Sequence, residues 1–133
     1  MSAEEVWYID SSAIVKLVAQ EAESVALRRF VRRRGPLVAS ALVRTEVHRA
    51  VLGLGERFHR RAADVLRGID LVRVNNQVLD DAGLLESATV RSLDAIHLAT
   101  AALFDRTLSG VITYDSRMAG AARLHGWTVS SPS

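Results

Sequence analysis

Short apolar runs alternate with longer amphipathic segments along the whole chain, and this alternation restricts the fold more than any other feature. The apolar runs are typical of buried strands, and the segments between them carry apolar residues at helical spacing. Such alternation predicts right-handed crossovers and a mostly parallel sheet, so we expect an α/β fold with about five strands between two layers of helices. The expected strands are 6–9, 37–40, 69–74, 110–114 and 127–130, and the expected helices are 11–20, 21–34, 40–55, 57–68, 78–87, 92–104 and 116–125.

Length and composition limit the kind of protein. The 133 residues, of which 49% are hydrophobic and 24% charged, fit one globular domain over residues 1–133 and are too few for two ordinary ones. No uncharged apolar run approaches the roughly 18 residues of a membrane helix, and the N-terminus lacks the basic segment of a signal peptide. The absence of cysteine excludes disulfides, zinc–thiolate sites and thiol catalysis. We expect a cytoplasmic protein that has no membrane partner.

Arginine is concentrated in one part of the sequence. Residues 28–61 contain ten arginines and only two acidic side chains, whereas acidic residues outnumber basic ones in the remainder. Such asymmetry is typical of a protein that binds a polyanion such as nucleic acid. Basic residues on helices are also often simply solvated, so the charge alone leaves both interpretations open. The expected phosphate contacts are Arg28, Arg32, Arg33 and Arg61.

Two aspartates directly follow expected strands. Asp10 comes after VWYI, and Asp115 comes after GVITY. In an open parallel sheet, ligands bind beyond the carboxyl ends of the strands, where the strand order reverses. Both carboxylates are therefore candidates for a functional site. The alternative is that each aspartate only caps the helix that follows it.

Two further carboxylates lie on apolar faces of expected helices. Glu46 falls within the apolar arc of the helix 40–55, and Asp94 shares a face with Leu98 and Ala101. An acid that faces the core is seldom buried without a partner. The alternative for Glu46 is a salt bridge to an arginine. The alternative for Asp94 is stabilisation by the helix dipole in the first turn.

Four acids from four segments can converge at one end of the sheet only if a cation offsets their repulsion. A ligand set made only of oxygen favours a hard divalent ion, Mg²⁺ or Mn²⁺. Such an ion activates water for attack on a phosphodiester, and the arginine-rich segment would hold the phosphate backbone. We interpret His97, one turn after Asp94, as a hydrogen-bonded core residue outside this site.

Four segments resemble the PIN-domain ribonucleases, and their length and order are closest to the VapC-type toxins of toxin–antitoxin pairs. The segments are YIDSSAIVKL, the glutamate within VRTEVHRA, SLDAIHLATA and ITYDSRM, which together span almost the whole chain. The resemblance implies a five-stranded parallel sheet and endonucleolytic cleavage of RNA that depends on Mg²⁺ or Mn²⁺. The residues at the family's acidic positions are Asp10, Glu46, Asp94 and Asp115, and none of the four is substituted.

The resemblance also implies supporting residues and partners. Ser12 and Thr113 match small hydroxyl positions that hold the carboxylates or a metal-bound water, and Arg117 lies where basic residues are frequent. A homodimer is implied, together with a small DNA-binding antitoxin of the VapB type that blocks the site. The four arginines of the expected phosphate contacts would then bind either RNA or this antitoxin.

Two other classes of protein compete with this interpretation. A receiver-type signalling domain is also an α/β protein with Mg²⁺ and strand-end aspartates, but it has adjacent acids after its first strand and a late lysine. This chain has only Asp10 there, and its one lysine is Lys16 in the first expected helix. The other class is a non-catalytic α/β module, in which the acids form caps and salt bridges and the arginines bind RNA or a protein.

Overall fold

The computed structural model describes residues 5–87 and 89–133. Its strands are β1 (Val6–Ile9), β2 (Leu37–Ser40), β3 (Asp70–Val72), β4 (Leu108–Ile112) and β5 (Val129–Ser130). Its helices are α1 (Ser11–Val18), α2 (Ser24–Arg34), α3 (Val43–Ala50), α4 (Glu56–Arg67), α5 (Asn76–Gly83), α6 (Ser92–Ala102) and α7 (Ser116–Leu124), with a short 3-10 turn, η1 (Asp105–Thr107), before β4.

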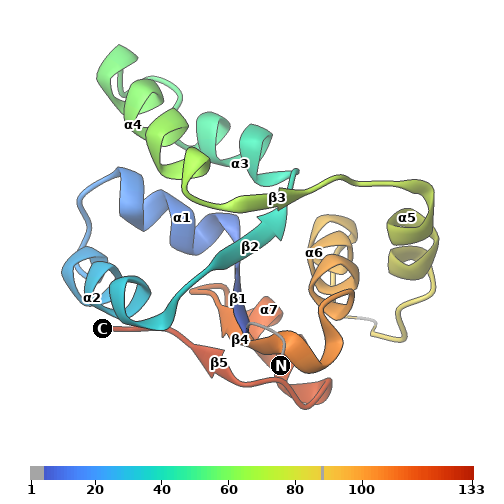
Figure 1. The fold of residues 1–133 in the computed structure, drawn as a ribbon. Helices are drawn as coiled ribbons and strands as arrows, with labels where there is room; N and C mark the ends of the chain where they lie inside the picture. The colour runs from blue at the N-terminus through green and yellow to red at the C-terminus, as the bar shows by residue number, and fades with distance from the viewer. Residues whose placement is uncertain (1–4, 88) are drawn as a thin grey trace.

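The five strands form one sheet in the order β3-β2-β1-β4-β5, and every neighbouring pair is parallel (Figure 1). This confirms the predicted α/β fold with five parallel strands. The first strand lies at the centre, and the chain order reverses between β1 and β4. A receiver-type domain has the strand order 2-1-3-4-5, so the observed order excludes that alternative.

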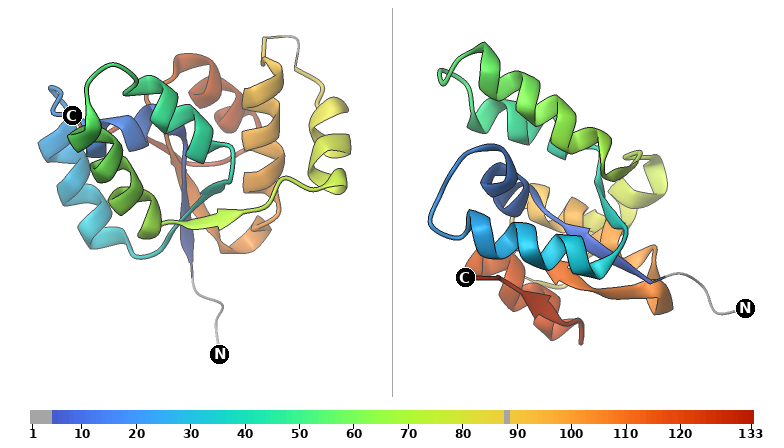
Figure 2. Two further views of the ribbon diagram at one scale, coloured as in Figure 1. Left: turned by 90° about the horizontal axis from the view of Figure 1, so that it is seen from above. Right: turned by 60° about the vertical axis from the view of Figure 1, so that its left-hand side comes forward.

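Alternate residues of the central strands feed two separate cores, as the two-residue period of a strand requires. Ile9 and Ile112 belong to the core that α1, α2, α3 and α4 cover, whereas Tyr8 and Val111 belong to the core beneath α6 and α7. Helix α5 does not cover the sheet directly but packs against α6, and Figure 2 shows these two helices side by side. The predicted three-layer arrangement is thereby confirmed.

The helix predicted over 40–55 is shorter than expected. Helix α3 ends at Ala50, and the following residues form turns in which Gly53 and Gly55 have positive φ values of 92° and 106°. Leu54, which lies beyond the end of α3, is consequently 53% exposed. The buried residues of this segment are Val43, Val47 and Val51.

Other differences lie at the ends of elements. The helix predicted over 78–87 is α5, which starts at Asn76 because the Asn75 side chain accepts a hydrogen bond from Val78 N at 3.0 Å and caps it. The strand predicted over 69–74 is shorter in the structure, where β3 has only three residues. Within residues 5–87 and 89–133, no helix combines the length and apolar character that crossing a membrane requires.

Candidate active site

The four predicted carboxylates line one cavity of about 470 Å³ at the carboxyl ends of β1 and β4. This is the place where the strand order reverses and where open α/β sheets bind ligands. Ser12, His97, Arg91 and Arg117 line the same cavity. The carboxylates come from the ends of two strands and from two helices, and they are Asp10, Glu46, Asp94 and Asp115.

Asp10 is the most enclosed of the four carboxylates, with 4% of its surface exposed. Its Oδ1 accepts hydrogen bonds from Ser12 Oγ at 2.6 Å and from Ala13 N at 3.1 Å, and its Oδ2 accepts one from Thr113 Oγ1. Burial raises the pKa of Asp10, and these three donors oppose the rise. Asp10 also caps α1, so the helix-capping alternative describes one of its functions.

Ser12 and Thr113 tie the ends of β1 and β4 together around Asp10. Ser12 Oγ accepts a hydrogen bond from Tyr114 N at 2.9 Å, and Thr113 Oγ1 accepts one from Asp115 N at 3.0 Å. Each hydroxyl therefore donates to the Asp10 carboxylate and accepts from the backbone that leads to Asp115. Because each hydroxyl makes both kinds of hydrogen bond, Ser12 and Thr113 fix the distance between Asp10 and Asp115.

Asp115 caps α7 with one of its oxygens. Its Oδ1 accepts hydrogen bonds from Arg117 N at 2.8 Å and from Met118 N at 3.2 Å. No group in the described part of the chain donates to Oδ2, which is free to bind a ligand in the cavity. The capping role and the site role are thus divided between the two carboxylate oxygens.

Asp94 lies in the first turn of α6 and is partly buried. Partial burial, the charge of Asp115 and the charge of Glu46 raise its pKa, while His97 and Arg117 act in the opposite direction. A helix dipole alone would favour the ionised form and lower the pKa. Desolvation and repulsion between carboxylates therefore dominate the environment of Asp94.

Glu46 pairs with a histidine and not with an arginine. Its Oε1 lies 2.7 Å from His97 Nε2, and 22% of the Glu46 side chain is exposed. His97 itself is 2% exposed, as a core residue should be, but its partner makes it part of the site. The sequence interpretation placed His97 outside the site; its position three residues after Asp94 on one helix face is the only signal that could have included it.

The donor set fits a hard divalent cation, because every candidate ligand is a carboxylate or hydroxyl oxygen. Within the described residues, however, no three His, Asp or Glu side chains stand close enough to chelate one ion together. Mg²⁺ commonly keeps several waters and binds only one or two carboxylates directly. The arrangement therefore suits an ion that the carboxylates hold partly through water.

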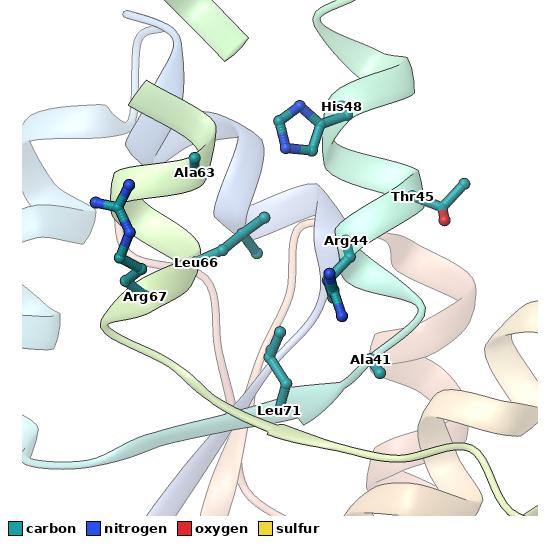
Figure 3. Close-up of a pocket in the computed structure, with 8 residues that line it drawn as sticks. All are labelled: Ala41, Arg44, Thr45, His48, Ala63, Leu66, Arg67 and Leu71. Atoms are coloured by element: carbon teal, nitrogen blue, oxygen red, sulfur yellow. The ribbon is translucent and has the colours of Figure 1, made fainter. Parts of the chain in front are cut away.

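The predicted phosphate contacts do not line this cavity. Arg28 donates to Gln20 Oε1 at 2.9 Å, and the other three project from α2 and α4 as exposed side chains. A second cavity of about 740 Å³ lies between α3, α4 and β3, where Arg44 and Arg67 stand on opposite sides (Figure 3). Arg91 and Arg117 are the arginines that line the acidic cavity.

The chain is similar to proteins of one known family. Residues 7–124 match the model of the PIN domain. The chain is 51% identical over 126 residues to Ribonuclease VapC46 of Mycobacterium tuberculosis, which covers 95% of this chain and 97% of the relative. It is also 36% identical over 130 residues to Ribonuclease VapC47 of the same species, with 94% and 96% of the two chains covered.

Two solved structures share the fold. The crystal structure of M. tuberculosis VapC20, described as a sarcin–ricin loop cleaving toxin, superposes with a TM-score of 0.76 at 17% identity and covers 95% of this chain and 99% of that one. A toxin–antitoxin complex from Klebsiella pneumoniae superposes with a TM-score of 0.71 at 20% identity and covers 95% and 97%. The chain therefore belongs to the PIN-domain family and, within it, to the VapC type.

Proposed function

We propose that this protein is an endoribonuclease that depends on Mg²⁺ or Mn²⁺ and acts as the toxin of a toxin–antitoxin pair. The observation that carries the proposal is the convergence of four carboxylates from separate segments in one cavity beyond β1 and β4. Relatives that are named ribonucleases and match nearly the whole chain support the same activity. Burial and the neighbouring carboxylates raise the pKa of Asp94, and such a shift is typical of a catalytic site more than of a module that only binds.

The side chains divide the chemistry among them. Asp10 and Asp115 are the rigid ligands, because backbone and hydroxyl donors fix both of them. Glu46 and Asp94 add charge from the helices on the other side of the cavity. A bound Mg²⁺ or Mn²⁺ would activate a water molecule and offset the charge that develops on the phosphodiester. Arg117 lines the cavity and would hold the phosphate for attack.

RNA would be held mainly through its backbone. Arg91 and Arg117 line the cavity, so they are suited to the phosphates next to the cleaved bond. Exposed arginines farther away would bind flanking phosphates without regard to base sequence and with strong dependence on salt. The candidates for this outer contact, or for contact with an antitoxin, remain Arg28, Arg32, Arg33 and Arg61.

The partners follow from the same proposal. A VapB-like antitoxin would block the acidic cavity, and the fold's similarity to a toxin–antitoxin complex supports such a partner. We also propose a homodimer, because leucines on and beside α5 and α6 stay exposed despite their size. The exposed fractions are 47% for Leu79, 80% for Leu84, 51% for Leu93 and 51% for Leu103.

Expression in a bacterial host tests the proposal as a whole. Induction of the parent chain should arrest growth and produce discrete RNA fragments, and Asp115→Asn should do neither at equal protein level. Co-expression of a cognate VapB-like antitoxin should restore growth. Arrest by Asp115→Asn as strong as by the parent would contradict a role for the acidic cavity.

A further inference from the structure

A buried chain of hydrogen bonds leads from the sheet to Glu46. Ser40 N, at the end of β2, lies 3.0 Å from Tyr8 Oη; Tyr8 Oη lies 2.5 Å from His97 Nδ1; and His97 Nε2 lies 2.7 Å from Glu46 Oε1. Tyr8 and His97 are 1% and 2% exposed. These four residues, which we term the buried relay, come from β2, β1, α6 and α3.

The donors and acceptors of the buried relay fit one arrangement of protons. The Ser40 backbone N–H can only donate, so Tyr8 Oη accepts this bond and its own hydrogen points to His97 Nδ1. His97 Nδ1 is then an acceptor, and the ring proton is on Nε2, from which it is donated to Glu46 Oε1. Every buried donor has an acceptor in this arrangement.

The other protonation patterns leave an unfavourable contact. If His97 carried its proton on Nδ1, the Nε2 lone pair would face the Glu46 carboxylate at 2.7 Å. If His97 carried both protons, the Tyr8 hydroxyl hydrogen would lose its acceptor among the described residues. Burial raises the pKa of Tyr8 far above its ordinary value, so the tyrosine remains a hydroxyl donor.

Glu46 needs such support more than Asp10 and Asp115 do. Asp10 and Asp115 are short side chains held by backbone N–H groups. Glu46 has a longer and more flexible side chain that projects from a helix of eight residues. Within the described residues, the one hydrogen bond of this side chain is to His97. Without this bond, the Glu46 side chain could adopt several rotamers.

We propose that Tyr8 and His97 are positioning residues that keep the Glu46 carboxylate directed into the acidic cavity, with His97 in the Nε2–H tautomer. The effect of this positioning on RNA cleavage rests on the proposed function. The tautomer of His97 and the orientation of Glu46 do not depend on it. The relay also joins the end of β2 to the start of α3, so the carboxylate and its helix are fixed to the same point of the sheet.

Nitrogen NMR of the metal-free protein at pH 7 tests the tautomer without a mutation. The chain has four histidines, and loss of one set of signals in His97→Gln assigns His97. We expect Nε2 to appear protonated and Nδ1 to appear as a hydrogen-bonded acceptor. Tyr8→Phe should shift the Nδ1 signal because it removes only the hydroxyl donor. A proton on Nδ1, or exchange between the two tautomers, would overturn the proposal.

Two substitutions of His97 separate positioning from packing. The amide of Gln reaches the place of Nε2 and can donate to Glu46, whereas the amide of Asn reaches only the place of Nδ1. Binding of Mn²⁺, followed by electron paramagnetic resonance, should weaken about 10- to 100-fold in His97→Asn and much less in His97→Gln. His125→Asn, at an exposed histidine, should bind Mn²⁺ like the parent. Equal losses in the Asn and Gln variants of His97 would contradict positioning.

A double-mutant cycle with Glu46→Gln shows whether His97 acts through Glu46. His97→Asn should weaken Mn²⁺ binding in the parent and add no further loss in the Glu46→Gln background. An equal further loss there would overturn the proposal. A parent protein that binds Mn²⁺ but cleaves no RNA would instead overturn the proposed function, and the spectrum and the Mn²⁺ affinities would still decide the role of the buried relay.

Discussion

Asp94 and Asp115 face the same cavity, where partial burial of Asp94 and the charge of Asp115 both raise the pKa of the Asp94 carboxyl. A raised pKa means that the folded state disfavours the ionised form of this side chain. The two carboxylates project from the N-terminal ends of α6 and α7, where helix dipoles would favour negative charge. At Asp94, desolvation and repulsion outweigh the dipole of α6, and a bound cation would offset both.

The first prediction concerns the stability of Asp94→Asn. Asparagine keeps the shape and removes one charge, so the metal-free variant should melt at the same temperature as the parent or higher. Added Mg²⁺ should raise the melting temperature of the parent, because it binds the folded state, and should raise that of Asp94→Asn much less. Asp80→Asn, an exposed carboxylate in α5, serves as the control and should respond to Mg²⁺ like the parent.

The opposite result would identify Asp94 as a first-turn acid only. In that case Asp94→Asn would lose the dipole interaction and become less stable by a few tenths to about 1 kcal/mol. Its Mg²⁺ shift would match that of the parent. Thermal melts of both proteins, with and without Mg²⁺, separate the two outcomes.

The second prediction is the pH dependence of this stability difference. The unfolded Asp94 titrates near its ordinary pKa of 3.8, and the folded one titrates at a higher pH. As the pH falls, Asp94 is therefore protonated in the folded state before it is protonated in the unfolded state. This protonation removes the destabilisation that the Asp94 charge causes in the folded parent protein. The advantage of metal-free Asp94→Asn should be complete at neutral pH and should vanish below about pH 3.8. Urea unfolding at several pH values measures it, and an advantage that grows on acidification would contradict the assignment.

The third prediction concerns the hydroxyl that joins the two strand ends. Thr113→Val removes the donor to Asp10 and the acceptor of the Asp115 N–H, both in a buried place. We expect a loss of about 1–3 kcal/mol in the free energy of unfolding and a marked loss of RNA cleavage. Thr107→Val is the matched control: it removes a hydroxyl bond to Phe104 O, away from the cavity, and should leave cleavage intact. Equal cleavage by both variants would remove Thr113 from the site.

Much of this site could be predicted because it depends on local order along the chain. An aspartate close behind a strand lies at the carboxyl edge of the sheet. Asp10 follows β1 directly, and Asp115 follows β4 after two residues. The alternative, that each aspartate caps the helix that follows it, is also correct, because both carboxylates cap a helix and line the cavity. The apolar residues around Asp94 indicated correctly that α6 is mostly buried.

The partner of Glu46 could not be predicted, because 51 residues separate it from His97 and 89 separate His97 from Tyr8. Only the packing of α3 and α6 around β1 brings the three together. The early end of α3 was missed for a different reason. Its apolar period continues to Leu54, but two glycines with positive φ turn the chain before the period ends.

The fourth prediction concerns the outer arginines. If Arg28, Arg32, Arg33 and Arg61 contact phosphates, replacing each with Ala should weaken RNA binding and reduce the salt slope by roughly 0.7 per lost contact on single strands. The measurement is RNA affinity at several salt concentrations in an Asp10→Asn background, which prevents cleavage. Arg106→Ala, in the turn before β4, is the control. An unchanged slope would assign these arginines to solvent or to the antitoxin.

Cleavage of a structured RNA by the purified chain tests the central claim most directly. The account predicts fragments with Mg²⁺ or Mn²⁺, almost none with Ca²⁺, and none in excess chelator, because Ca²⁺ prefers a larger and less regular oxygen shell. Asp10→Asn, purified in the same way, should be inactive under all conditions. Undiminished cleavage by the parent in excess chelator, or equal cleavage by Asp10→Asn, would contradict a metal-dependent nuclease built on these four carboxylates.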